Sequence, residues 1–187
     1  MKFEIPKPMR IEHDALHADL VRATQAGGHT GEAAKAVAKI LHAHFVKEEE
    51  YALPPLGLLT ALAHGNFEHG MADVLTLTDK LEAELPQMLA EHKQIVAALE
   101  KLVAAAKIEH QTHIVDFAEK LMLHAQTEEE VAYPTALLIG RYIKTALAVS
   151  CSLSQALQAV HGSAGGASAL VSQTADRSHV LPRSFRR

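Results

Sequence analysis

A short pattern that occurs twice, eighty positions apart, constrains this chain more than any other feature. His44 is followed four residues later by Glu48, which opens a run of three glutamates, and a proline comes ten residues after the histidine. His124 and Glu128 repeat this arrangement in the same register. Residues four apart lie on one face of an α-helix, so each pair presents an imidazole beside a carboxylate. Two copies in one register indicate that both pairs serve a single site.

A second echo precedes each copy of the pattern. Glu12-His13 comes about thirty residues before the first copy, and Glu91-His92 comes about thirty residues before the second. The chain therefore reads twice as a histidine, a gap and His-x-x-x-Glu, which indicates duplication of a helix pair. We expect the two halves to share one metal site, and the candidate ligands are His13, His44, Glu48, His92, His124 and Glu128.

Residue usage favours an all-α fold. Strong helix formers such as Ala, Leu, Glu, Lys and Gln are frequent, whereas β-branched runs bounded by turn residues are missing. Pro54 and Pro134 are expected to kink their helices at equivalent levels, and Pro86 to interrupt a third. Short turns between the helices predict an antiparallel up-down-up-down four-helix bundle with internal duplication of the helix pair. The expected helices cover about 9–25, 32–64, 72–107 and 112–147, with a glycine-rich turn at 27–31.

The length of 187 residues predicts one domain with short additions at its ends. Residues 1–8 are expected to form an extended leader, because Pro6 and Pro8 disfavour a helix there. The bundle is assigned to 9–150. Residues 151–187 are predicted to be a flexible C-terminal tail, because Gly and Ser become frequent within them.

Composition also limits the class of protein. The net charge of −4 argues against a nucleic-acid binder, which usually presents a basic face. The single cysteine, Cys151, excludes an internal disulfide and a cysteine-rich metal site. No apolar run of about 18 residues and no apolar signal segment is found, so we expect no membrane span and a cytoplasmic location. The sequence identifies no protein partner.

The donor types indicate which ions the site would take. Imidazole nitrogens with carboxylate oxygens suit iron, manganese or zinc rather than metals selected by thiolates. Six ligands are too many for one tetrahedral zinc ion. They fit two ions, each with two histidines and with Glu48 and Glu128 as bridges, which leaves positions for water, dioxygen or peroxide. Burial of such pairs without a metal would leave costly unpaired polar groups.

Several neighbouring residues remain open. His17 shares the helix face of His13 and could add a third histidine to one ion, although the second half has Val96 at the equivalent place. Tyr51 and Tyr133 follow their histidines by seven and nine residues, so either could approach the site, although packing is expected for both. The other acids of the two glutamate runs are expected on a solvated face or behind the ligands, and these are Glu49, Glu50, Glu129 and Glu130.

These motifs resemble the hemerythrin-like family, also called the HHE cation-binding domain. The resemblance covers roughly residues 10–147 and rests on Glu12-His13, Glu91-His92 and the two His-x-x-x-Glu-Glu motifs with their prolines. It implies an antiparallel four-helix bundle that holds a non-haem di-iron centre. The ligands that it implies are the six named above.

The chain departs from the pattern of the oxygen-carrying members. Those have five histidines and two carboxylates, with His-x-x-x-His on the third helix and an acid five residues after the histidine on the fourth. Here the third helix offers only His92, and the internal repeat favours Glu128 over Glu129 on the fourth. The set of four histidines and two glutamates is closer to the family's di-iron stress-repair proteins, which often carry a further cysteine-bearing domain. Ferritin-like proteins use Glu-x-x-His, which is not found here.

The resemblance implies a non-haem di-iron protein that binds or senses a small ligand, such as dioxygen, nitric oxide or peroxide. The cofactor expected is two iron ions with an oxo or hydroxo bridge, and manganese and zinc are the alternatives. A first alternative function is a di-iron enzyme for peroxide removal, or for oxidative or nitrosative stress repair of iron–sulfur centres. A second is a zinc-bound or metal-free helical interaction module. The sequence leaves open whether the site turns over a substrate.

Overall fold

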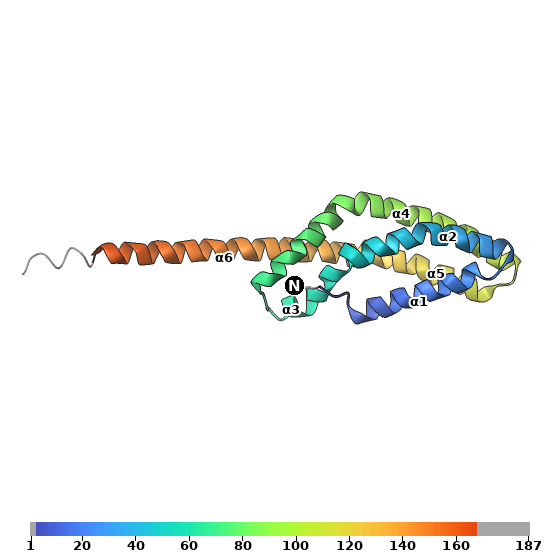
Figure 1. The fold of residues 1–187 in the computed structure, drawn as a ribbon, viewed down its shortest axis with the longest axis horizontal. Helices are drawn as coiled ribbons and strands as arrows, with labels where there is room; N and C mark the ends of the chain where they lie inside the picture. Colours follow the sequence, from blue (N-terminus) through green and yellow to red (C-terminus); the bar gives the residue numbers. More distant parts are fainter. Residues whose placement is uncertain (1–2, 168–187) are drawn as a thin grey trace, which may run out of the picture. The chain divides into compact units, whose positions relative to one another are not determined.

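The structure, a computed structural model, describes residues 3–167, and this part of the chain is helical without any strand. The all-α prediction is therefore confirmed. Figure 1 shows the elements in chain order. The α-helices are α1 (Lys7–Thr24), α2 (Gly28–Lys47), α3 (Leu59–Ala63), α4 (Val74–Ile108), α5 (Thr112–Thr127) and α6 (Tyr133–Ala167). Two π-helical turns cover Glu48–Ala52 and Glu128–Ala132, and two 3₁₀ turns cover Pro54–Leu58 and His69–Asp73.

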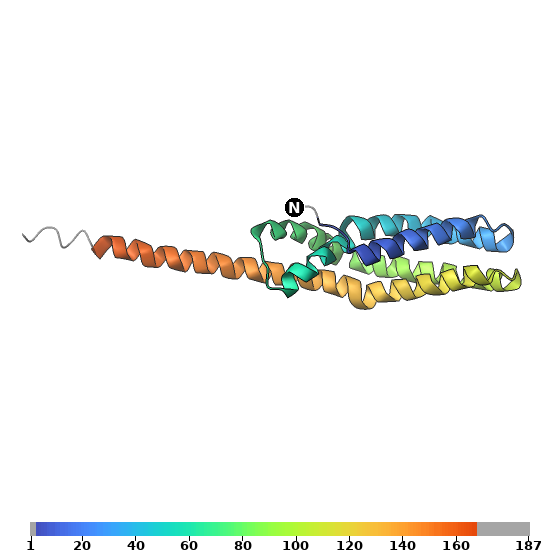
Figure 2. The same ribbon diagram turned by 90° about the horizontal axis from the view of Figure 1, so that it is seen from below.

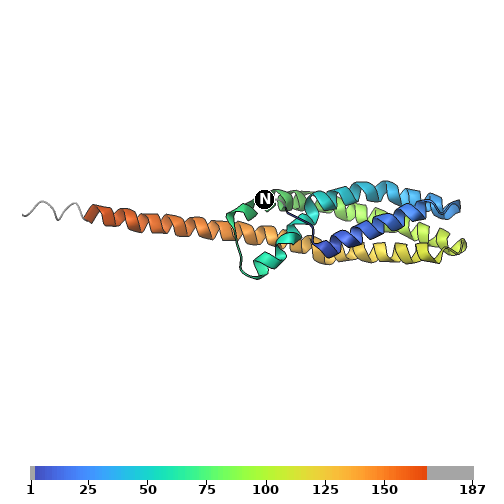
Figure 3. The ribbon, with the colours of Figure 1, turned by 60° about the horizontal axis from the view of Figure 1, so that its bottom comes forward.

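Four of the helices pack around a shared apolar core. Helix α1 contacts α2 and α5, and α4 also contacts α2 and α5 (Figures 2 and 3). Each of these four helices directs an apolar stripe toward the core, as expected for amphipathic helices that bury their Leu and Ile side chains against one another. The buried members include Leu16, Leu41, Leu99 and Leu121, one from each helix.

A second apolar core lies further along the same elements. It is formed by residues that follow the two π-helical turns, by the first part of α4 and by Ile5. Leu53, Leu81 and Ile143 are fully buried in it. Along the chain, the six predicted ligands lie where residues of one core give way to residues of the other. A polar layer therefore separates two apolar cores.

The turn between α1 and α2 is shorter than the sequence predicts. The glycine-rich stretch 27–31 was expected to be a turn, but α2 already begins at Gly28. Glu109, at the end of α4, accepts hydrogen bonds from the backbone N–H groups of His29 and Thr30 at 2.8 and 3.0 Å. These are donors that an N-terminus leaves unpaired. A carboxylate from eighty residues away therefore caps α2, which local sequence could not reveal.

The prolines act in different ways. Pro54 and Pro134 each follow a π-helical turn, Glu48–Ala52 and Glu128–Ala132 respectively, so the helical path changes just before each proline. Pro86 lies inside α4, which the structure does not split. The helix continues although one backbone hydrogen bond is lost at the proline, and Leu81 and Met88, before and after it, are fully buried.

The chain divides into two units, Met1–Leu147 and Ala148–Arg187. The first contains the packed helices; α1 begins at Lys7, slightly inside the predicted leader of 1–8. In the second unit, helix α6 continues to Ala167, where a flexible tail was predicted from residue 151. Ser152 and Ser154 donate hydrogen bonds to carbonyls four residues earlier, which is compatible with a helix. Residues 168–187 lie outside the described part.

Within 3–167, one helical stretch, Thr112–Ala156, is long and apolar enough to cross a membrane by length and composition. Core helices of soluble proteins meet the same test. Ile114, Phe117 and Leu121 of this stretch are buried in the first apolar core. The stretch also carries His124 and Glu128. The 18-residue window of this stretch that passes the test is only 22% buried, so packing within the protein accounts for only a small part of its apolar character.

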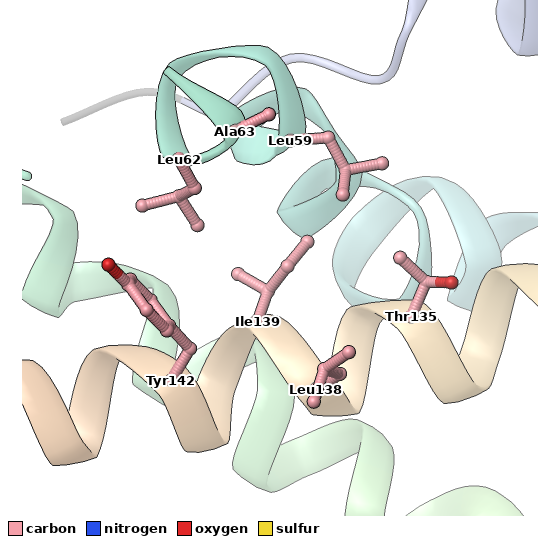
Figure 4. Close-up of a pocket in the computed structure, with 7 residues that line it drawn as sticks. All are labelled: Leu59, Leu62, Ala63, Thr135, Leu138, Ile139 and Tyr142. Atoms are coloured by element: carbon pink, nitrogen blue, oxygen red, sulfur yellow. The ribbon is translucent and has the colours of Figure 1, made fainter. Parts of the chain in front are cut away.

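An apolar groove of about 290 Å³ lies between α3 and the first turns of α6. Figure 4 shows Leu59 and Leu62 of α3 facing Ile139 and Tyr142 of α6 across this space. The lining is completed by Ala63, Thr135 and Leu138. None of the six predicted ligands lines it.

Truncation of the first core should destabilise the protein strongly. Leu99 is fully buried among all four helices, so Leu99→Ala should lower the free energy of unfolding by about 2–5 kcal/mol. Leu123→Ala, at a side chain that is 64% exposed, is the matched control and should change it by less than about 0.5 kcal/mol. Urea unfolding of the metal-free protein measures both. Equal effects of the two changes would contradict the assignment of this core.

Candidate metal centre

All six predicted ligands lie together in the polar layer between the two apolar cores. Their side chains are at most 4% exposed. His13 comes from α1, His44 from α2 and His92 from α4; the other three come from the end of α5 and from the first residue of each π-helical turn. The six form two overlapping groups in which one ligand atom per residue lies within 4.8 Å of the others. The groups are His13, Glu48, His124, Glu128 and His44, Glu48, His92, Glu128.

The Nε2 atoms of the histidines face the two carboxylates. Within the His-x-x-x-Glu pairs, His44 Nε2 lies 2.9 Å from Glu48 Oε1, and His124 Nε2 lies 3.1 Å from Glu128 Oε1. Across the cluster, Glu128 is 3.4 Å from His13 Nε2 and 3.5 Å from His92 Nε2. Both glutamates belong to both groups, so each can contribute one oxygen to either position.

The opposite ring nitrogen of each histidine points to a different carboxylate. Nδ1 of His44 lies 2.8 Å from Glu91, and Nδ1 of His92 lies 2.9 Å from Glu129. A carboxylate in this place holds the proton on Nδ1 and orients the ring, so that the lone pair of Nε2 points into the cluster. Lys47 also pairs with Glu91 at 2.6 Å.

The other two histidines have the same kind of partner at longer distance. His124 Nδ1 lies 3.4 Å from Glu12, and His13 Nδ1 lies 3.6 Å from Glu49. Glu12 and Glu49 are about half exposed, at 55% and 50%. All four imidazoles are therefore backed by a carboxylate, but two of them more loosely.

These four acids follow the repeat of the sequence. Glu12 and Glu91, the acids of the two Glu-His echoes, lie beside Nδ1 of His124 and His44, the histidines of the His-x-x-x-Glu pairs. Glu49 and Glu129, the second acids of the two glutamate runs, lie beside Nδ1 of His13 and His92, the histidines of the echoes. The sequence predicted a place behind the ligands for Glu49 and Glu129 as one of two options, and did not assign Glu12 and Glu91. The repeated Glu-His pairs were the signal in the sequence that could have identified Glu12 and Glu91. Glu50 and Glu130 instead bond to Lys80 and Gln126 on the surface.

Electrostatics favour a cation in this layer. Burial alone would raise the pKa of Glu128, but hydrogen bonds from His124, His13 and His92 outweigh it and hold the pKa well below its usual range. Burial would lower the pKa of His92, but the negative carboxylates of Glu128 and Glu48, at 3.5 and 3.7 Å from its Nε2, outweigh it and raise the pKa to about 10. The same balance raises the pKa of the other three histidines, His13, His44 and His124.

Two buried oxygens support the fit of a metal. Glu48 Oε2 and Glu128 Oε2 are buried without a hydrogen-bond partner. Such groups are costly unless an ion or another donor satisfies them. With four imidazole nitrogens around them, the donor set is one of nitrogen and oxygen, which suits first-row metals such as iron, manganese or zinc.

Tyr133 joins the cluster, although packing was expected for it. Its hydroxyl donates to Glu48 Oε1 at 2.6 Å and lies 3.3 Å from His92 Nε2. Burial and the charges of Glu48 and Glu128 raise the pKa of this phenol, so it keeps its proton. Tyr133 follows Glu128 by five residues, which an α-helix would place on different faces; the π-helical turn brings both inward. Sequence periodicity alone could not have found it.

Openings reach the cluster from the surface. One, of about 210 Å³, is lined by His13 together with His17, His42 and Glu49. Another, of about 310 Å³, reaches His124 and Glu128 past Met9. His17 is exposed and belongs to neither metal group, so the structure leaves it outside the cluster.

Comparisons with family models, with curated proteins and with solved structures give no match for the chain. The chemistry of the site therefore rests on its own geometry. That geometry is a buried cluster of histidines and glutamates that could hold metal ions.

Loss of an acid behind a ligand should weaken metal binding. Glu129→Gln keeps the size of the side chain but removes the charge beside His92 Nδ1, and should lower metal affinity by about 10–100-fold. Glu130→Gln is the matched control, because this neighbouring acid is exposed and bonds only to Gln126 among the contacts of the described chain. Calorimetric titration with Co²⁺ compares them. Equal affinities would contradict the role given to Glu129.

Metal binding should depend on pH in a defined direction. A protonated imidazole cannot bind a metal, and the pKa of His92 is raised to about 10. Below that pH an incoming ion must displace protons, so the apparent affinity should rise as pH rises from 6 towards 9. Titration calorimetry in two buffers of different ionisation enthalpy would count the protons released. An affinity independent of pH over this range would contradict the raised pKa values.

Proposed function

We propose that this chain is a hemerythrin-like protein whose non-haem di-iron centre binds or senses a small ligand such as dioxygen, nitric oxide or peroxide. One observation carries the proposal. Four imidazoles and two carboxylates converge in a buried layer, and every imidazole is turned so that Nε2 faces the carboxylates while Nδ1 faces another acid. A purely structural layer would not need this double orientation.

The donor arrangement supports two ions rather than one. Each group has two histidines, and both groups include Glu48 and Glu128. Two carboxylates that belong to both groups would bridge a pair of ions, and four ligands per ion leave positions for a small molecule. When bound, ferrous ions supply reversible binding, or reduction, of a small oxygen or nitrogen-oxide ligand.

The residues around the ligands have separate tasks in this proposal. Glu12, Glu49, Glu91 and Glu129 orient the imidazoles through Nδ1. The apolar cores on both sides exclude water from the layer and strengthen its electrostatic interactions. The openings beside His13 and His124 admit a ligand of small size.

The proposal includes the finer description of the fold. We take α1, α2, α4 and α5 as an up-down-up-down bundle that arose by duplication of a helix pair. Support comes from the contacts of α1 with α2 and α5, and of α4 with the same two helices, and from the π-helical turn that begins at the glutamate of each His-x-x-x-Glu pair.

Metal analysis of purified protein tests this function. We expect near two irons per chain and a visible absorption band that changes on addition of dioxygen, nitric oxide or peroxide. The variants His44→Ala and Glu128→Ala should lose the iron and the absorption band, because each removes a buried metal ligand. His113→Ala, at an exposed histidine on α5, is the control and should keep both.

The outcomes separate the candidate functions. A reversible spectral change without turnover supports ligand binding, and sustained gas evolution from peroxide would show an enzyme instead. Protein that takes up zinc but no iron would indicate a zinc-structured module. Protein that binds no metal under any reconstitution would contradict the proposal as a whole.

A further inference from the structure

The two metal positions differ at one place where the repeat is broken. The residue eighty positions before Tyr133 is Leu53, so only one of the two equivalent places carries a hydroxyl. Both side chains are buried, at 1% and 0% exposure. A phenol and an isobutyl group at equivalent buried places give the two positions different chemistry.

Tyr133 lies against one position only. Its hydroxyl is 2.6 Å from Glu48 Oε1, 3.3 Å from His92 Nε2 and 3.5 Å from His44 Nε2. Its ring also stacks on that of His92, with centroids 5.7 Å apart and planes at 21°. His44 and His92 belong only to the group His44, Glu48, His92 and Glu128, whereas Glu48 belongs to both groups, so the two histidines place Tyr133 at this position.

The other position is bordered by an aromatic ring without a polar atom. Phe45 stacks on His13, with centroids 4.6 Å apart. The residue eighty positions after Phe45 is Ala125, so this contact is also confined to one side. Phe45 offers no hydrogen bond, and within residues 3–167 no hydroxyl comparable to that of Tyr133 bonds to a carboxylate next to His13.

The supporting acids show the same difference. The Nδ1 atoms of His44 and His92 have carboxylate partners at 2.8 and 2.9 Å, whereas those of His124 and His13 have theirs at 3.4 and 3.6 Å. The surface openings described above also reach His13 and His124. One position is therefore held ready by short hydrogen bonds, and the other is looser and closer to solvent.

We propose that Tyr133 makes the two metal positions unequal: it holds Glu48 in place beside His44 and His92, so that this position fills first and binds its ion more tightly. The inference rests on the proposed function, because it concerns the same centre. Tyr133 acts here as a positioning residue through Glu48, and its oxygen faces the two Nε2 atoms of that position. Ligands that are already oriented lose less freedom on binding, which raises affinity.

Stepwise titration of metal-free full-length protein with Co²⁺ tests the inference. Wild type should bind two ions in steps that differ by about tenfold or more in affinity. Tyr133→Phe should weaken the first step by about 10–100-fold, so that the two steps merge. Tyr51→Phe is the matched control: Tyr51 is equally buried, but its hydroxyl contacts Met88 Sδ at 3.6 Å, and both steps should be unchanged.

Fluorescence gives a second readout that a merely structural role would not produce. The chain has three tyrosines and no tryptophan, so its emission reports on tyrosine. The first equivalent of Co²⁺ should quench the part of the emission that comes from Tyr133, which is the part that the Tyr133→Phe variant lacks. Quenching of that emission only by the second equivalent would overturn the proposed order.

A pair of ligand variants decides the order even if Tyr133→Phe does not fold. His92→Ala should remove the tight step, and His124→Ala should leave it in place. The reverse result, equal affinities in wild type, or unchanged steps in folded Tyr133→Phe would overturn the inference while leaving a two-metal centre intact. Wild type that binds no Co²⁺, iron or zinc would instead refute the proposed function, and the inference with it.

Discussion

The rest of the structure depends on the burial of four imidazoles and two carboxylates in one layer. Ionisable groups are rarely buried, because removal from water costs several kcal/mol for each unless partners compensate. Here every Nε2 meets a shared glutamate, and the opposite nitrogen of His44 and His92 is hydrogen-bonded to an acid, whereas Nδ1 of His13 has an acid only at 3.6 Å and no hydrogen-bond partner. The helices must keep their register for these contacts to form at once. The polar layer therefore fixes how the apolar cores above and below it are aligned.

The π-helical turns are the local device that makes this layer compatible with two cores. Glu48 and Glu128 each begin such a turn, and the N–H five residues later bonds to their carbonyls. An inserted turn of this kind shifts the inward face by one residue, so that Leu53 and Tyr133 become buried after their glutamates. Such turns are frequent at functional sites, and here one begins at each of the two shared glutamates.

Residue usage and the sequence repeat made the helical fold and the six buried residues predictable. Features that depend on π-helical turns or on contacts remote in sequence were not predictable from them. The helical class followed from residue usage. Four of the six buried residues followed from a four-residue spacing that holds within any α-helix, and His13 and His92 followed from the repeated Glu-His pair. Tyr133 was considered near the site but expected to pack, because an α-helical period does not describe the π-helical turn that brings it inward. The start of α2 at Gly28 was missed because Glu109, its cap, is remote in sequence. Helix α6 extends past residue 150 to Ala167, whereas the glycine and serine content after that point favoured a tail, with a further helical turn or two possible at 154–160.

Each metal group takes its members from both halves of the chain. His13 and Glu48 meet His124 and Glu128 in one group, and neither N-terminal nor C-terminal half holds a full set. Any ion bound here is consequently a cross-link between the halves, and its binding energy counts towards their association. Separation of the halves and release of the ions are then one event. A single helix pair could complete such a centre only by associating with a second pair. When both pairs belong to one chain, that association is intramolecular and does not depend on protein concentration.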